Sequence, residues 1–200
     1  MKRALRQLAI SALLAALCGD VAAQAAPPAP ERVAACIACH GEGGRSTQPL
    51  TPSLAGQPSF YAITQLFLFR EGRRASEAMT AVAKGMSDAD LRAFSDLIGK
   101  LPPPPAAAAA GPDAARMAQG AALAERHRCV SCHGSDFAGG QQVPRLAGQR
   151  EDYLAKALTE FRAGTRIGYT GAMAEALAGI SADDLAVLAA YLARFSKPGV

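Results

Sequence analysis

The sequence contains no stretch in which apolar and polar residues alternate with the period of two that marks a half-buried β-strand. It also lacks a long apolar run, since Leu8–Cys18 is well short of the roughly 20 apolar residues that a membrane-spanning helix needs. We therefore expect neither a β-sheet protein nor a bilayer-spanning helix.

The chain also lacks a strong excess of one charge. It carries 21 Lys and Arg residues against 17 Asp and Glu residues, a formal net charge of +4 at pH 7. Part of the positive surplus lies at the start of the chain, in Lys2, Arg3 and Arg6, so the remainder is closer to neutral. Because nucleic-acid binding usually depends on a basic patch, this balance argues against a nucleic-acid partner.

The amino-terminal segment has a basic start, then the apolar run, then small residues through Ala23. This order is typical of a secretory signal peptide. We expect residues 1–23 to form a signal peptide, with cleavage after Ala23 or Ala26, and the mature protein to be periplasmic. Cys18 belongs to the apolar run and would be removed with it.

Cysteine and histidine are scarce, with five and three residues respectively. Apart from Cys18, every cysteine lies in one of two pentapeptides, Cys36–His40 and Cys129–His133, and no thiol is left for a disulfide. Both pentapeptides read Cys-x-x-Cys-His, which indicates covalent attachment of a c-type haem: the thiols add to the porphyrin vinyl groups and the histidine coordinates the iron. We expect two covalently bound haem c groups, attached through Cys36, Cys39, Cys129 and Cys132.

Two other interpretations of paired cysteines fit less well. In a zinc ribbon the two Cys-x-x-Cys units lie about 15 to 20 residues apart, whereas the two pentapeptides here lie in separate halves of the chain. A thioredoxin-like redox site lies near a βαβ pattern, and the sequence has no strands to form one.

The second half of the chain repeats the first. Leu54–Gln57 recurs as Leu146–Gln149, and the residues that follow keep the same order in both halves. Because polar residues stay in step as well as apolar ones, the match indicates two homologous domains rather than shared composition. The matching pairs are Tyr61 and Tyr153, Phe69 and Phe161, Arg70 and Arg162, Gly72 and Gly164, and Arg74 and Arg166.

A segment rich in proline and alanine separates the two repeats. It runs from Leu101 to Pro112, and its consecutive prolines favour an extended polyproline II conformation. We expect a first domain at residues 27–100, a linker at residues 101–112 and a second domain at residues 113–197.

Each repeat has the pattern of a small helical domain. Ser87–Asp90 and Ser181–Asp184 have the Ser-x-x-Asp form of a capping box, and apolar residues recur behind them at helical spacing. The expected fold is therefore all-α, with two tandem domains that each bind one haem. Further helices are expected at residues 59–71, 113–127 and 151–163, with a short one at Glu31–Ala35 behind several prolines.

A haem iron that only transfers electrons needs a second axial ligand, and methionine sulfur raises the reduction potential relative to a second histidine. Met79 aligns with Met173, and each lies ahead of a capping serine. Met86 aligns instead with Ile180, which marks an apolar packing position. The expected axial ligands are His40, Met79, His133 and Met173.

Other residues have less specific patterns. Met117 and His127 have no counterpart in the first repeat and are expected to be packing or surface residues. The carbonyls of Pro52 and Pro144 either accept the second ring N–H of a ligand histidine or belong to a simple turn. The remaining paired residues either bind haem propionates or are ordinary core and surface residues: Tyr61, Tyr153, Arg74 and Arg166.

From Cys36 to Phe195 the sequence resembles the dihaem cytochromes c of the cytochrome c4 family. The resemblance is carried by the doubled Cys-x-x-Cys-His-Gly, Leu-Ala-Gly-Gln and Phe-Arg-x-Gly-x-Arg motifs and by the methionine ahead of Ser-x-x-Asp. It implies two class I cytochrome c domains related by a pseudo-twofold axis, with haem propionates facing across the interface. It also implies a periplasmic carrier of electrons from quinol–cytochrome c reductase towards a terminal oxidase. Some members of the family associate loosely with the membrane.

The expected function is electron transfer without catalysis, because histidine and methionine close both iron sites. The alternative is a dihaem cytochrome subunit of a periplasmic dehydrogenase, such as a sulfide-oxidising flavocytochrome, which shares the same repeat. A dihaem peroxidase or a thiosulfate-oxidising enzyme is disfavoured, since such enzymes usually have an open or differently ligated haem.

The first repeat departs from the family pattern in one respect. In the family, a glycine of the leading helix contacts an aromatic residue of the last helix. The second repeat has Gly120 and Tyr191 for this contact, whereas the first has Leu97 at the aromatic position and a shortened leading helix. We therefore expect the first domain to be the less stable one.

Overall fold

The computed structural model of the protein describes residues 26–105, 114–166 and 171–196. The expected signal peptide and most of the expected linker lie outside the described residues. Within them there is no strand, and Gly140 and Val143 form only an isolated bridge. No helix in the described part of the chain has the length and apolar character needed to cross a membrane. The all-α expectation is confirmed.

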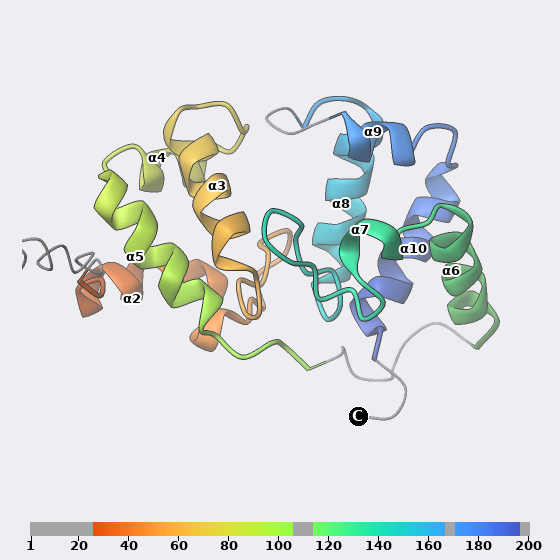
Figure 1. Ribbon diagram of the computed structural model, residues 1–200, viewed down its shortest axis with the longest axis horizontal. Coiled ribbons are helices and arrows are strands. Elements are labelled where there is room, and N and C mark those ends of the chain that lie inside the picture. Colours follow the sequence, from red (N-terminus) through yellow and green to blue (C-terminus); the bar gives the residue numbers. More distant parts are fainter. Residues whose placement is uncertain (1–25, 106–113, 167–170, 197–200) are drawn as a thin grey trace, which may run out of the picture.

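The helices form two groups that lie side by side, one from each sequence repeat (Figure 1). This confirms the expected two-domain architecture, while the exact limits of the domains stay a prediction. The first domain contains α2 (Pro30–His40), the 3₁₀ helix η1 (Glu42–Gly44), α3 (Ser59–Arg70), α4 (Glu77–Ala83) and α5 (Asp88–Gly99). The second contains α6 (Ala114–Arg126), α7 (Val130–His133), α8 (Glu151–Arg162), α9 (Ala172–Ala176) and α10 (Ala182–Arg194).

The equivalent helices begin and end where local signals place them. After α3 and α8 the chain turns at Gly72 and Gly164, whose φ angles of 64° and 68° lie in the left-handed region that favours glycine. Ser87 begins α5 with a complete capping box, in which Asp90 binds the Ser87 amide in return. At the start of α10, Ser181 accepts a hydrogen bond from the Asp184 amide at 3.0 Å.

The leading helices of the two domains differ. α2 begins at Pro30 and continues without a break through the first pentapeptide, so the expectation that this helix is limited to Glu31–Ala35 is wrong. In the second domain α6 and α7 are separate, and Arg128 between them has a φ angle of 49°. The described residues before Cys36 include no residue with positive φ, so the first helix runs on into its haem pentapeptide.

The contact between leading and last helices also differs. A Cβ atom added to Gly120 on α6 would lie 2.4 Å from the Cβ atom of Tyr191 on α10, so the two helix backbones approach closely there. This confirms the expected glycine–aromatic contact in the second domain. In the first, Arg32 on α2 forms an ion pair with Asp90 on α5 and lies 5.1 Å from the centre of the Phe94 ring. A polar contact thus replaces close helix packing.

Each domain has its own hydrophobic core, and the second core is the larger. The first consists of Leu66, Phe69, Ala83, Met86, Leu91 and Phe94. The second consists of Leu123, Ala124, Phe137, Ala147, Leu154, Leu158, Leu177, Ile180, Leu185, Val187, Leu188, Ala189, Leu192 and Ala193. Since buried apolar area is the main source of stability, the second domain has the stronger packing.

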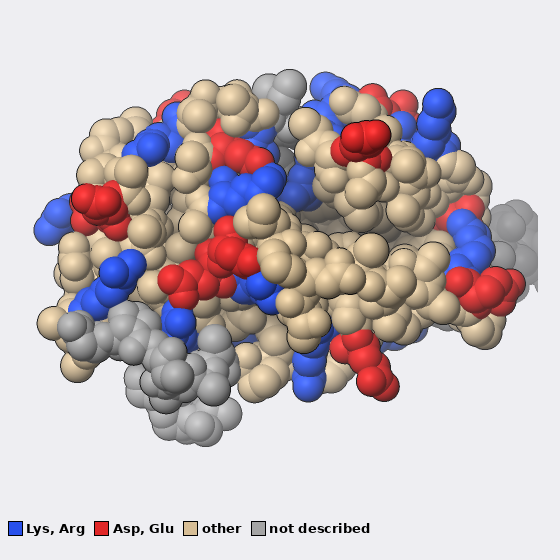
Figure 2. All heavy atoms as spheres, turned by 180° about the vertical axis from the view of Figure 1, so that it is seen from behind, with Lys and Arg blue, Asp and Glu red and all other residues tan. Residues whose placement is uncertain are grey.

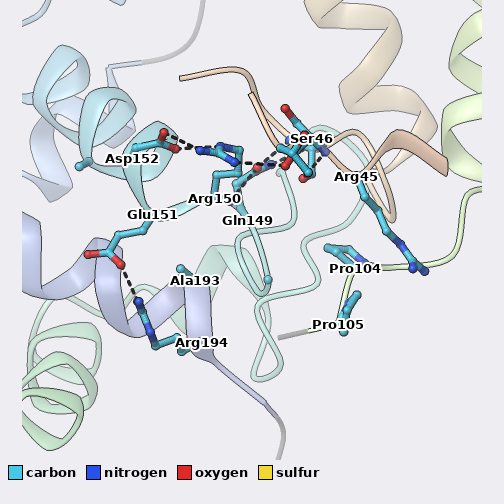
Figure 3. Close-up of a pocket in the computed structure, with 14 residues that line it drawn as sticks. Arg45, Ser46, Pro104, Pro105, Gln149, Arg150, Glu151, Asp152, Ala193 and Arg194 are labelled. Carbon is cyan, nitrogen blue, oxygen red and sulfur yellow. Dashed lines mark hydrogen bonds and ion pairs between the residues drawn. The ribbon is translucent and has the colours of Figure 1, made fainter. Parts of the chain in front are cut away.

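The domains are docked by direct contact. The loops that follow the two haem pentapeptides face each other between the two helix groups (Figure 1). The first linker residues pack on both loops: a Cβ atom at Gly56 would lie 2.7 Å from Pro103, and one at Gly148 would lie 3.2 Å from Pro104. A cleft of about 670 Å³ opens beside this contact, lined by residues of both domains (Figure 3).

Charged side chains are interspersed on the face opposite that of Figure 1, with no single large basic area (Figure 2). Several arginines of the described residues are also neutralised by ion pairs. Arg70 lies 2.8 Å from Asp88, and Arg150 lies 2.7 Å from Asp152. On this face, positive and negative side chains are therefore mixed rather than separated into areas of one sign.

Candidate haem centres

Both pentapeptides end a helix on their histidine. α2 ends at His40 and α7 ends at His133. The next residues, Gly41 and Gly134, have φ angles of 78° and 79°. A Cβ atom at Gly41 would lie only 2.1 Å from the carbonyl oxygen of Arg45. Only glycine permits the sharp turn that sends the chain away from the histidine ring.

The two histidines are buried and held in the same way. His40 is 7% exposed and His133 is 5% exposed. Nδ1 of His40 lies 2.8 Å from the carbonyl oxygen of Pro52, and Nδ1 of His133 lies 3.0 Å from that of Pro144. Because a carbonyl only accepts, Nδ1 carries the proton and Nε2 keeps its lone pair for a metal. Burial lowers the pKa of both rings although the carbonyl bond opposes it, which favours the neutral, metal-binding form.

The cysteines of each pentapeptide have unequal environments. Cys39 and Cys132 are exposed, whereas Cys36 and Cys129 are half-buried, and none of the four forms a disulfide. Burial raises the pKa of Cys36 and Cys129, so these thiols are protonated at neutral pH. Across the described part of the chain, no group of three or more His, Cys, Asp or Glu residues is arranged to hold a metal ion.

The aligned methionines lie on the cores of their own domains. Met79 on α4 and Met173 on α9 are half-buried and pack against the first and second core respectively. Cys36 and Cys129 pack against the same two cores. Ser76 caps α4 by accepting a hydrogen bond from the Met79 amide at 3.4 Å. Each domain thus places a methionine on the same core as its first haem-attaching cysteine.

Met86, the other methionine of the first repeat considered as an axial ligand, occupies a packing position. Met86 is 8% exposed and its equivalent Ile180 is 5% exposed. Their carbonyl oxygens accept equivalent hydrogen bonds, from Arg70 at 3.2 Å and from Arg162 at 2.9 Å. The alignment of these two positions is confirmed. The residues without a counterpart in the first repeat, Met117 and His127, are half-buried in α6 and directly after it.

An arginine–tyrosine cluster lies between the domains. Arg74 of the first domain and Arg166 of the second both donate to the hydroxyl of Tyr153, at 2.8 and 3.2 Å. The sequence identified these residues as candidates, but it did not predict that both arginines bind one hydroxyl. The Arg166 side chain is 6% exposed, and its Nε has no hydrogen-bond partner among the described residues. A buried donor with unused capacity suits a carboxylate such as a haem propionate.

Two buried glutamines at the interface were not recognised as functional from the sequence. Gln57 is 6% exposed and Gln149 is 5% exposed, and each binds main-chain groups of the other domain. The available signal was a polar residue kept in step in both repeats within an apolar motif. That signal indicates that a glutamine is needed at this position of both repeats, but it does not identify the residue that the glutamine binds.

The donor set of each domain fits haem c. Two thiols, a neutral imidazole with a free Nε2 and a thioether sulfur are present in each domain, and a buried guanidinium lies at the interface. Bound haem would supply an iron that gains and loses one electron.

Comparison with known proteins supports this assignment. A family model described as Cytochrome c matches residues 31–101 and 117–196. The chain is 34% identical over 190 residues to cytochrome c4 of Pseudomonas aeruginosa, covering 90% of each protein. It is 36% identical over 172 residues to the thiosulfate dehydrogenase electron acceptor of Thiomonas intermedia, covering 82% of this chain and 78% of that protein.

The similarity extends to three dimensions. The crystal structure of reduced recombinant cytochrome c4 from Pseudomonas stutzeri matches with a TM-score of 0.75 and 30% sequence identity, covering 86% of this chain and 100% of that one. With a cytochrome c domain in each half, the chain carries two covalently bound haem c groups and transfers electrons. The chain belongs to the dihaem cytochrome c4 family.

Proposed function

We propose that each domain attaches one haem through its own pentapeptide and supplies both axial ligands of the iron. The hydrogen-bonded Nδ1 of each buried histidine leaves Nε2 for the metal. The methionine and the first cysteine of each domain pack on one core. The thioether bonds are assigned to Cys36, Cys39, Cys129 and Cys132, and the axial ligands to His40 with Met79 and His133 with Met173.

This ligation supports a carrier without catalytic activity of its own. Where protein side chains occupy both axial positions, a substrate finds no free position at the iron. The protein is proposed to act in the periplasm, carrying electrons from quinol–cytochrome c reductase towards a terminal oxidase. The observation that carries this proposal is the equivalent pair of a carbonyl-held histidine and a core-packed methionine in both domains.

The proposed ligation is tested by an optical and redox titration of the purified protein. We expect two haems per chain and the thioether–iron charge-transfer band in the oxidised form. Met79→Ala and Met173→Ala should each remove part of this band and lower one of the two reduction potentials. Met86→Leu and Met117→Leu serve as controls and should leave the band intact. A single haem, a vacant sixth position in the purified protein, or peroxide turnover that depends on Met79 contradicts the proposal.

A thiosulfate dehydrogenase is the second candidate donor, favoured by the similarity to the electron acceptor from Thiomonas intermedia. The two donors are separated by mixing the oxidised protein with purified thiosulfate dehydrogenase and thiosulfate, or with purified quinol–cytochrome c reductase and a reduced quinol. The physiological donor should reduce both haems much faster than the other. The alternative of a sulfide-oxidising flavocytochrome subunit predicts instead a stable complex with a flavin-containing chain on purification.

A further inference from the structure

The two buried glutamines bind the opposite domain in a reciprocal way. Gln149 accepts a hydrogen bond from the Ser53 amide at 2.8 Å and donates to the Ser53 carbonyl at 2.8 Å. Gln57 does the same to Arg145, accepting from its amide at 3.1 Å and donating to its carbonyl at 3.0 Å. Each side-chain amide therefore binds one residue of the other domain at two points. Figure 3 shows Gln149 reaching from the start of α8 towards the loop of the first domain.

The peptide groups bound by the glutamines also hold the ligand histidines. The amide of Ser53 and the carbonyl of Pro52 belong to one peptide group, and that carbonyl accepts the Nδ1–H of His40. The amide of Arg145 and the carbonyl of Pro144 likewise form one peptide group, which accepts from His133. Each peptide is thus hydrogen-bonded at both ends, to its own domain's histidine and to the other domain's glutamine.

Hydrogen bonds in such a chain strengthen one another, because donation from the N–H end of the peptide group polarises its carbonyl. A more polarised carbonyl is a better acceptor for the ring N–H of histidine. This makes the imidazole a stronger electron donor to its metal and stabilises Fe(III) relative to Fe(II). Gln149, Ser53 and His40 are each at most 7% exposed, so water does not readily replace these bonds.

We propose that Gln149 is a positioning residue for His40 and that Gln57 is a positioning residue for His133. Each domain then adjusts the reduction potential of the haem in the other domain through a single peptide group. Separation of the domains would break both relays, so domain docking and redox potential are coupled. The proposal rests on the proposed role of the two histidines as axial ligands.

The test compares Gln149→Leu and Gln57→Leu with the wild-type protein, all three loaded with haem. In the reduced, diamagnetic state, the ring Nδ1–H resonance of each histidine reports the strength of its carbonyl hydrogen bond. Gln149→Leu should move the His40 resonance upfield and leave that of His133 in place, while Gln57→Leu should do the reverse. In a titration, Gln149→Leu should raise the same potential that Met79→Ala changes.

Two further variants separate positioning from simple attachment of the domains. Asp152→Ala removes another hydrogen bond across the interface, to the Leu50 amide, that does not reach a histidine-bound peptide, and it should leave both ring resonances unchanged. Gln149→Glu keeps an acceptor for the Ser53 amide, and in its protonated form the other carboxyl oxygen donates to the Ser53 carbonyl as Nε2 of Gln149 does. In that form the variant should restore the His40 resonance, which also guards against misfolding of the leucine variant.

The outcomes are distinguishable. Equal shifts of both histidines, shifts as large in Asp152→Ala, or no shift in Gln149→Leu would overturn the proposal and leave the glutamines as structural contacts only. If Met79→Ala leaves the spectrum of the protein unchanged, the ligand assignment itself fails, independently of the glutamine variants.

Discussion

At the scale of single residues, the haem centres depend on atoms that a list of ligands omits. The carbonyl oxygen of Pro52 fixes the proton on Nδ1 of His40 at 2.8 Å, and only then is Nε2 available to a metal. Gly41 lets the chain turn immediately after that histidine. Residues without ionisable side chains thus decide the chemical state of the ligand.

The first prediction concerns Gly120. In a helix, glycine to alanine normally stabilises by roughly 0.5–1 kcal/mol, but here the new Cβ atom would lie 2.4 Å from the Cβ atom of Tyr191. The overlap lies close to the backbone and cannot be relieved by a flexible side chain. We expect Gly120→Ala to destabilise the second domain by about 1–3 kcal/mol, the usual cost of overpacking.

Thermal unfolding of the haem-loaded protein measures this effect. Gly85→Ala is the matched control, because no atom lies within 4 Å of the added Cβ and the backbone at Gly85 is not in the left-handed region. Equal melting temperatures for the Gly120→Ala variant and the wild-type protein would contradict the prediction.

At this scale the sequence distinguishes candidate ligands from packing residues, but it does not predict the interface. Repetition separated Met79 from Met86, and the structure confirms Met86 as a buried packing residue. The proline carbonyls were one of two possibilities, since each proline precedes a Leu-Ala-Gly-Gln motif, and the structure shows that they bind the histidines. Gln149 was not assigned a role, since its partner Ser53 lies in the other domain and docking geometry is not encoded locally.

At the scale of helices, the two domains join their leading and last helices by different contacts. α6 and α10 meet through a close glycine–aromatic contact, whereas α2 and α5 are joined by Arg32, Asp90 and the ring of Phe94. The sequence predicted the shortening of the leading helix from its prolines. It did not predict that α2 continues through the pentapeptide. In the second domain the turn at Arg128 separates α6 from α7, and the sequence carries no signal that the first domain lacks such a turn.

The second prediction is a pH-dependent role for Asp90 in the first domain. Hydrogen bonds from Arg32 and from Ser87 hold the pKa of Asp90 well below its ordinary value. A lowered folded-state pKa means that the carboxylate stabilises the domain above its ordinary pKa and that this contribution is lost as the pH falls through the folded-state value. Asp90→Asn should therefore destabilise the first domain at pH 7.

A pH series of thermal unfolding experiments checks this sign. The difference between Asp90→Asn and the wild-type protein should shrink as the pH falls below about 4, the ordinary pKa of aspartate. Asp96→Asn, an exposed change on the same helix, is the control. A difference that stays constant or grows on acidification would show that the ionised carboxylate is not the stabilising group.

The third prediction is that the first domain is the less stable of the two. Its core is smaller and its leading helix is held by a partly exposed ion pair, which contributes little. Amide hydrogen exchange of the whole protein should show faster exchange in α2 and α5 than in α6 and α10. Equal protection of the two helix pairs, or greater protection of α2 and α5, would refute this expectation.

At the scale of the whole molecule, the linker contacts both domains in addition to connecting them. Pro103 and Pro104 pack on the glycines of the two Leu-Ala-Gly-Gln motifs, while the glutamines of the same motifs cross between the domains. In each half, the Leu-Ala-Gly-Gln motif therefore forms a turn, contacts the linker and contacts the other domain. Composition indicated an extended linker, but it did not show whether the domains touch.

The fourth prediction concerns Tyr153, whose hydroxyl accepts from an arginine of each domain. Tyr153→Phe removes this shared acceptor and leaves the buried Arg166 with one hydrogen bond fewer. Loss of a buried hydrogen-bond partner costs about 1–3 kcal/mol. The variant should therefore lower the midpoint of unfolding and weaken domain docking, which small-angle X-ray scattering would record as an increased radius of gyration.

Tyr191→Phe is the control, because Tyr191 contacts Phe137 and Phe195 through its ring within one domain. If both variants keep the compact scattering profile, the Tyr153 hydroxyl does not hold the domains together.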